Sequence, residues 1–170
     1  MTQRSIPAAA LADIESEAPL DALLPFLLVE HPNLSDPIRV VSDHFDYYWG
    51  GSLWSGVIFD AVPLTDENRP AGAELIVQNV DRRIGQALEK ANEPPRVSLW
   101  LLSSASFDLS VNPRTELGVT TPIYGFTEFD LKDVRADVST ISGTVGLRDF
   151  ATEPWPFVRA TIDRAPGLWW

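Results

Sequence analysis

The segment Asp43–Gly56, DHFDYYWGGSLWSG, constrains the fold more than any other part of the sequence. Aromatic and other residues alternate in it, and a Gly-Gly pair stands in the middle. Adjacent glycines supply the positive φ angles that a tight hairpin needs, and alternate side chains of a strand lie on one face. The segment therefore predicts a β-hairpin whose first strand carries Phe45, Tyr47 and Trp49 on one face.

Residues 26–150 hold several more short apolar runs with β-branched and alternating residues, which favour strands. These runs are FLLVEHP, PIRVVSD, a strand with Val57, Phe59 and Ala61 in alternation, LIV at 75–77, RVSLWLLSS, FTEFDLKDV and VSTISGTVGL. Gly143 in the last run is a candidate for a β-bulge. The chain is expected to be mainly β, in the α+β class, with its β-rich core over residues 26–150.

Two helices are expected beside the strands. Ser5 and Pro7 are typical of a helix start, which predicts a helix over residues 5–17 within an N-terminal arm of residues 1–25. Asn79 precedes an apolar stripe with helical spacing, which predicts a helix over about residues 79–92. The prolines at positions 154 and 156 predict an extended arm over residues 151–170.

Composition limits the chemistry that this chain can carry. Its 170 residues, 45% of them hydrophobic, suffice for one globular domain. With no cysteine, the sequence excludes disulfides, thiolate zinc sites and cysteine-ligated iron–sulfur clusters. It has no apolar run of membrane-spanning length, and Asp13, Glu15 and Glu17 interrupt the start, so we expect no membrane span and no secretion signal.

The net charge of −11 argues against nucleic-acid binding. DNA is a dense anion that needs clustered cations on its partner, whereas the basic residues here are scattered. A surface that repels DNA is the expectation instead.

No common catalytic or nucleotide-binding motif occurs in the sequence. His31 and His44 would form a metal site only if they converged with Asp43 or Asp46, and solvated strand ends explain these four residues better. We therefore expect no metal and no cofactor.

A small hydrolase is one alternative function. Glu128 and Asp130 lie two residues apart, so on a regular strand they would face one side at a spacing that suits a carboxylate pair. Alternating acids on a solvent-facing strand have the same spacing, and we expect no enzyme.

A carbohydrate-binding module is a second alternative. Trp49 and Trp54 flank the Gly-Gly turn and could together present a stacking surface for host glycans. Tryptophan is also favoured in cores and at protein interfaces, and that interpretation is preferred for these two residues.

The order of several motifs resembles one known family. These motifs are VEHP at 29–32, PIRVVSD at 37–43, GVIFDAVPL at 56–64, LIVQNVDRRIGQAL at 75–88 and PGLW at 166–169. In that order and spacing they resemble tailed-phage minor tail proteins, a domain-of-unknown-function family related in role to the lambda-type minor tail protein M.

This resemblance implies a structural protein of the virion tail tip, assembled in the host cytoplasm. It implies a β-sandwich or barrel-like domain resembling the tail-tube fold, with one flanking helix and extended terminal arms. The expected partners are further copies in a threefold or sixfold ring, the adjacent tail tube and hub proteins, and the tape-measure protein, with no specific nucleic-acid binding.

Two sets of residues are candidates for that role. Buried tryptophans stabilise interfaces, so the subunit-interface candidates are Trp155, Pro166, Gly167, Leu168, Trp169 and Trp170. Acidic residues facing the lumen of a ring would repel passing DNA, and the lumen candidates are Asp66, Glu67, Glu128 and Asp130.

Overall fold

The computed structural model describes residues 11–12, 15–17, 19–61, 72–78, 94–137 and 140–146, and the structural account below concerns these residues. They form one sheet of 11 strands with both parallel and antiparallel pairs. The order across the sheet is β5-β6-β11-β10-β7-β1-β2-β4-β3-β9-β8.

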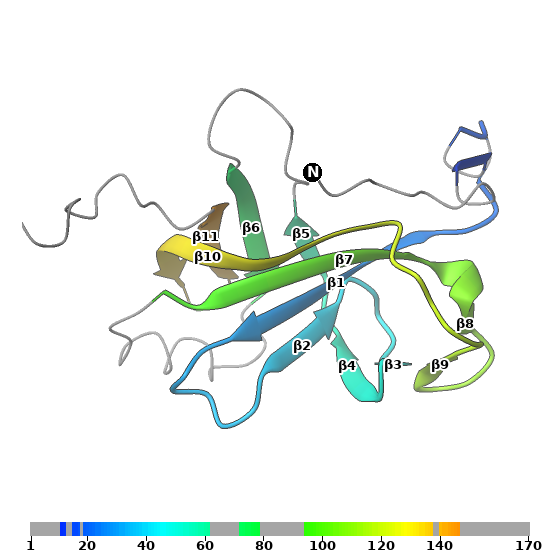
Figure 1. The fold of residues 1–170 in the computed structure, drawn as a ribbon, viewed down its shortest axis with the longest axis horizontal. Helices are drawn as coiled ribbons and strands as arrows, with labels where there is room; N and C mark the ends of the chain where they lie inside the picture. The colour runs from blue at the N-terminus through cyan, green and yellow to red at the C-terminus, as the bar shows by residue number, and fades with distance from the viewer. Residues whose placement is uncertain are drawn as a thin grey trace, which may run out of the picture.

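The strands differ widely in length. Their bounds are β1 Leu23–Glu30, β2 Ile38–Val41, β3 Tyr47–Trp49, β4 Ser52–Gly56, β5 Phe59–Ala61, β6 Gly72–Gln78, β7 Arg96–Ser103, β8 Phe107–Asp108, β9 Arg114–Glu116, β10 Tyr124–Ala136 and β11 Thr140–Gly146. A single 3-10 turn, Ser104–Ser106, joins β7 to β8. Figure 1 shows β3, β4, β8 and β9 gathered at one end, β6, β10 and β11 at the other, and β1 and β7 between them.

Strands β1 and β7 carry buried side chains on both faces of the sheet. Leu27 lies opposite Leu99 on one face, and Phe26 lies opposite Trp100 on the other. Both strands therefore read as continuous apolar runs in the sequence, as central strands do. The strands on either side of β1 and β7 therefore contribute to two separate cores, one on each face of this central pair.

The first face carries what we call the aliphatic core. Its buried residues come from β1, β2, β5, β6, β7, β10 and β11 and are Leu27, Val29, Ile38, Val40, Phe59, Leu75, Val97, Leu99, Leu131 and Val145. The other face carries the aromatic core, with buried Leu24, Phe26, Val41, Tyr47, Trp54, Leu102 and Phe107. The partly buried Trp49 and Trp100 also pack against the aromatic core.

The predicted mainly β class is confirmed, and so is the hairpin at the Gly-Gly pair. Gly50 and Gly51 have φ of 57° and 74°, and Tyr47 pairs with Trp54 across the turn. Phe45 lies before β3 and is exposed, so only the other two members of the predicted aromatic face belong to the strand. The third predicted strand begins at Phe59 rather than Val57.

The described residues do not form a closed barrel, because β5 and β8 are the two ends of the sheet. They include no helix of seven or more residues, and the predicted helix over residues 79–92 lies outside them. Of the predicted helix over residues 5–17, the five described residues include one helical turn, in which the N–H of Glu15 donates to the carbonyl of Leu11 at 3.0 Å.

The sequence predicts a bulge at Gly143 on β11, but the structure has the irregularity on the neighbouring strand, β10. The irregularity lies on β10, where Asp133 and Val134 oppose Gly143 alone, and Asp133 has a φ of 51°. The glycine serves a different purpose, because a Cβ on it would stand 2.9 Å from Leu131 Cδ1. Its missing side chain makes room for a residue of the aliphatic core. Among the described residues, no helix has the length and apolar character needed to cross a membrane.

Candidate functional site

The predicted carboxylate pair lies on an irregular part of β10. The register shifts between Phe126 and Phe129, and Glu128 has a left-handed φ of 61°. Its backbone N–H donates to Ser98 Oγ at 3.1 Å. Because a bulge breaks the alternation of side chains, the inference that Glu128 and Asp130 share a face does not hold.

Asp130 belongs to a row of charged residues that crosses three strands. Arg96 on β7 lies directly opposite both Asp130 on β10 and Glu30 on β1. Side chains directly opposite each other in neighbouring strands share a face and stand close together. The predicted lumen acid Asp130 is therefore next to a cation.

The two tryptophans of the glycan alternative lie mainly inside the molecule. Trp54 is 4% exposed, and its Nε1 donates to the carbonyl of Trp49 at 3.1 Å. Both indoles pack edge-on against Phe26 with ring centroids 5.1–5.2 Å apart. Trp54 therefore presents no ring face on which a sugar could stack.

In the metal alternative, the side chains of Asp43, Asp46 and His31 make other contacts. Asp43 pairs with Arg114, Asp46 Oδ1 accepts from the N–H of Gly56 at 2.8 Å, and the N–H of His44 donates to Asp43 Oδ1 at 2.6 Å. His31 shapes a turn, because its Nδ1 accepts from the N–H of Asn33 at 3.0 Å. In the part of the chain that the structure describes, no three metal-ligating side chains gather.

A cluster that the sequence analysis missed joins the segment before β3 to β9. Arg114 Nη1 contacts Asp43 Oδ2 at 2.8 Å and the Tyr47 hydroxyl at 2.6 Å, and that hydroxyl donates to the same carboxylate oxygen at 2.6 Å. The guanidinium also lies over the Phe45 ring, 4.1 Å from its centroid. We call these residues, Asp43, Phe45, Tyr47 and Arg114, the Arg114 clamp.

The clamp shifts the ionisation of its tyrosine. Burial and the hydrogen bond to Asp43 raise the pKa of Tyr47 to about 12, although Arg114 opposes this change. The Asp43 and Arg114 partners are 71 positions apart in sequence, so no local pattern could have predicted the contact. Through Tyr47, which belongs to the aromatic core, the clamp ties β9 to that core.

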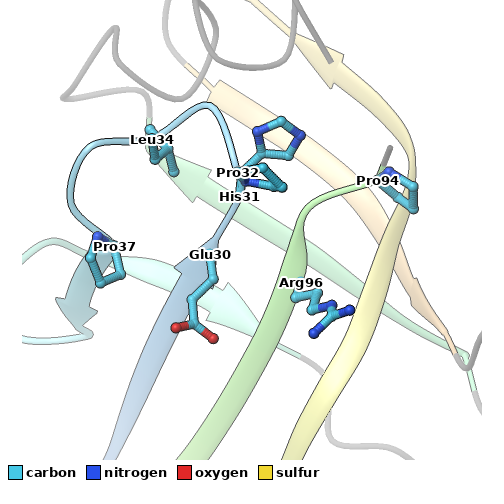
Figure 2. Close-up of a pocket in the computed structure, with 7 residues that line it drawn as sticks. All are labelled: Glu30, His31, Pro32, Leu34, Pro37, Pro94 and Arg96. Atoms are coloured by element: carbon cyan, nitrogen blue, oxygen red, sulfur yellow. The ribbon is translucent and has the colours of Figure 1, made fainter. Parts of the chain in front are cut away.

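A pocket of about 440 Å³ lies at the end of β1 and the start of β7 (Figure 2). Its walls include Pro32, Leu34, Pro37 and Pro94, and its lining includes the two charged residues Glu30 and Arg96. Proline has no backbone N–H, so three positions of the lining donate no backbone hydrogen bond. His31 also lines the pocket, so its lining mixes apolar rings with polar and charged groups. The pocket could receive an apolar group that is accompanied by charge.

Exposed apolar side chains lie on the outward side of the ribbon formed by β4, β3 and β9. Leu53 and Tyr48 are cross-strand neighbours, 51% and 43% exposed, and Tyr48 lies beside Thr115. Leu117 follows the end of β9, two positions after Thr115, and is 68% exposed. We call Tyr48, Leu53 and Leu117 the outer apolar face.

Several predicted site residues lie outside the described residues. These are the interface candidates Trp155, Pro166, Gly167, Leu168, Trp169 and Trp170, and the lumen candidates Asp66 and Glu67.

The described part of the chain is thus a mainly β domain with one open, mixed sheet that buries two cores on opposite faces. The chain belongs to the family described as Domain of unknown function (DUF1833), whose sequence model matches residues 9–160. No curated protein matches the sequence.

Proposed function

We propose that this protein is a structural component of a phage tail tip, a ring that joins the tail tube to the tail hub and lets DNA pass. The order of the motifs VEHP, PIRVVSD and LIVQNVDRRIGQAL, which resembles tailed-phage minor tail proteins, supports this role. On this proposal the open sheet is a variant of the tail-tube type of β-domain.

The observation from the structure that carries the proposal is the outer apolar face. Tyr48 and Leu53 are cross-strand neighbours, Leu117 follows the adjacent strand β9, and these three large residues are 43–68% exposed. Grouped exposed apolar side chains are typical of protein contact surfaces. Among the described residues the sheet also ends in two short strands, β5 and β8, of three and two residues. Assembly with other subunits would cover both features.

The charge of the chain agrees with a conduit for DNA. A net charge of −11 per subunit, repeated around a ring, repels phosphate and keeps DNA from binding to the wall. The described acids Glu128 and Asp130 remain lumen candidates, but Arg96 lies directly opposite Asp130, so the surface around Asp130 carries both charges.

The test is native mass spectrometry and negative-stain electron microscopy of the purified chain, alone and mixed with tail tube and hub proteins. Rings of three or six copies are expected. A chain that stays monomeric with all of these partners would overturn the proposal.

A matched pair of variants tests the outer apolar face. Leu53→Asp should reduce ring formation, because it places a charge in a surface that assembly would cover. Leu20→Asp changes a leucine that is 95% exposed and outside this face, and should assemble normally. Equal assembly of the two variants would remove the outer apolar face from the interface.

The glycan and hydrolase alternatives receive less support. Trp54 is buried, and the bulge at Glu128 removes the spacing argument for a carboxylate pair. A glycan array with the wild-type chain and with Trp49→Ala tests the first alternative, and binding that depends on Trp49 would restore it.

A further inference from the structure

The pocket of Figure 2 combines two opposite charges with the rings of His31 and of three prolines. Glu30 and Arg96 are cross-strand neighbours on β1 and β7, and both are exposed. Within the described residues neither side chain makes an ion pair. Figure 2 shows Glu30 and Arg96 on one side of the pocket, with Pro32, Pro94 and the His31 ring on the other. A fitting ligand would carry one charge of each sign beside an apolar group.

One segment of this sequence has that composition. Residues 163–170 read DRAPGLWW, with adjacent opposite charges at Asp163 and Arg164 and two indoles at the end. Arginine binds carboxylates through a planar fork, and indoles have large apolar faces that suit a wall of proline rings. The charges and the apolar surfaces of the segment both complement the pocket.

We propose that residues 163–170 of one copy dock in this pocket of the neighbouring copy, an inference that rests on the proposed ring. Arg164 pairs with Glu30, Asp163 pairs with Arg96, and an indole of Trp169 or Trp170 fills the space between the prolines. In a head-to-tail ring every subunit then donates one such segment and accepts one.

The fold sets the starting point of the segment near this end of the sheet. Gly146, the last residue of β11, lies opposite Asp130, in the same cross-strand row as Arg96 and Glu30. Three strand spacings separate Gly146 from Glu30, roughly 14 Å. The sixteen residues 147–162 span at most about 55 Å when extended, which is well beyond this separation.

The absence of cysteine allows a clean cross-linking test. Full-length chains carrying Pro32→Cys are mixed with isotopically labelled full-length chains carrying Ala165→Cys, and the mixture is oxidised mildly. Pro32 is an exposed residue of the pocket wall. Because each chain has one cysteine, a disulfide between positions 32 and 165 can form only between copies. Mass spectrometry of the digested mixture measures it.

The matched control replaces Pro32→Cys by Val119→Cys, which is fully exposed and does not line the pocket. The expected result is at least ten times more cross-link to position 32 than to position 119. Equal yields, or no cross-link to position 32, would overturn the docking. If rings still form in that case, the proposed function stands without this contact, whereas a monomeric chain would overturn both.

Charge reversal gives a second measurement. Arg164→Glu and Glu30→Arg should each weaken assembly a few-fold, because each places like charges together, and the double variant should recover most of the loss. No recovery in the double variant would remove this ion pair from the docking.

Discussion

The two cores of this domain are built on the same pair of strands but are closed in different ways. The aliphatic core is covered by the seven-residue strands β6 and β11 and the 13-residue strand β10, which pair along their length. The aromatic core is covered by β3, β4, β8 and β9, none longer than five residues. Large rings and the Arg114 clamp hold these short strands in place.

This comparison teaches that short strands, which form few backbone hydrogen bonds with their neighbours, depend on side-chain contacts to stay in place. Phe26 alone packs against the rings of Tyr47, Trp49, Trp54 and Phe107, which come from three different strands. Such aromatic pairs add roughly 0.5–1.5 kcal/mol each beyond the burial of their area. The aromatic core should therefore depend on a few residues, and the aliphatic core on many.

The sharpest test uses two neighbouring residues of β1 that face opposite cores. Phe26→Ala should lower the free energy of unfolding by about 3–5 kcal/mol, and Leu27→Ala by about 2–5 kcal/mol, since both side chains are fully buried. Urea unfolding measures both. Only Phe26→Ala should change the near-ultraviolet circular dichroism strongly, because Trp49 and Trp54 pack on that ring.

The shape of the transition sharpens the comparison. Because β1 contributes to both cores, each variant should unfold in a single transition. Two separate transitions in either variant would show that the cores are independent, which would contradict the shared role of β1.

A smaller effect is expected where the Arg114 clamp meets β4. A Cβ on Gly56 would stand 2.6 Å from the carbonyl oxygen of Phe45 and 2.9 Å from that of Asp43. Backbone atoms cannot rotate away, so Gly56→Ala should cost about 1–3 kcal/mol, the usual range for overpacking. Gly118→Ala is the matched control, because no atom lies within 4 Å of its added Cβ. Thermal unfolding compares the two variants, and equal stabilities would contradict the close packing of Gly56 against the backbone of Phe45 and Asp43.

The clamp should also make stability depend on alkaline pH. The pKa of Tyr47 is about 12 in the folded chain, above the ordinary value of 10.0, so the folded state holds this proton more tightly. The stabilisation is complete below pH 10 and is lost as the pH rises towards 12. Tyr47→Phe removes the hydroxyl, so its unfolding midpoint in urea should fall less than that of the wild type between pH 9 and 11. Parallel pH profiles would contradict the clamp.

The sequence predicted the central strands well because their signal is local. β1, β7 and the hairpin at Gly50 and Gly51 each appear as apolar runs or as turn residues. By contrast, β8 and β9 have two and three residues and are fixed by pairing with each other and with β3, far away in sequence. Periodicity cannot reveal strands of that length.

The candidate sites show the same division. The alternation rule failed at Glu128 because β10 contains a bulge, which depends on how Ser98 of β7 is placed. The pocket lining joins Glu30, Pro37 and Arg96 from separate segments, and the Arg114 clamp joins residues 71 positions apart. Side-chain chemistry was visible in the sequence, but its assembly depends on the register of the sheet.

The smallest expected effect concerns the bulges that shape the aliphatic half. Glu128 has a φ of 61°, a region in which a residue other than glycine costs roughly 1–2 kcal/mol and asparagine is tolerated better. Glu128→Asn should therefore raise the free energy of unfolding by about 0.5 kcal/mol. Thr127→Asn, on the neighbouring exposed residue with an ordinary φ, should give no gain. Precise urea unfolding curves of the two variants decide the matter. If both variants lower the stability equally, the left-handed φ of Glu128 carries no strain.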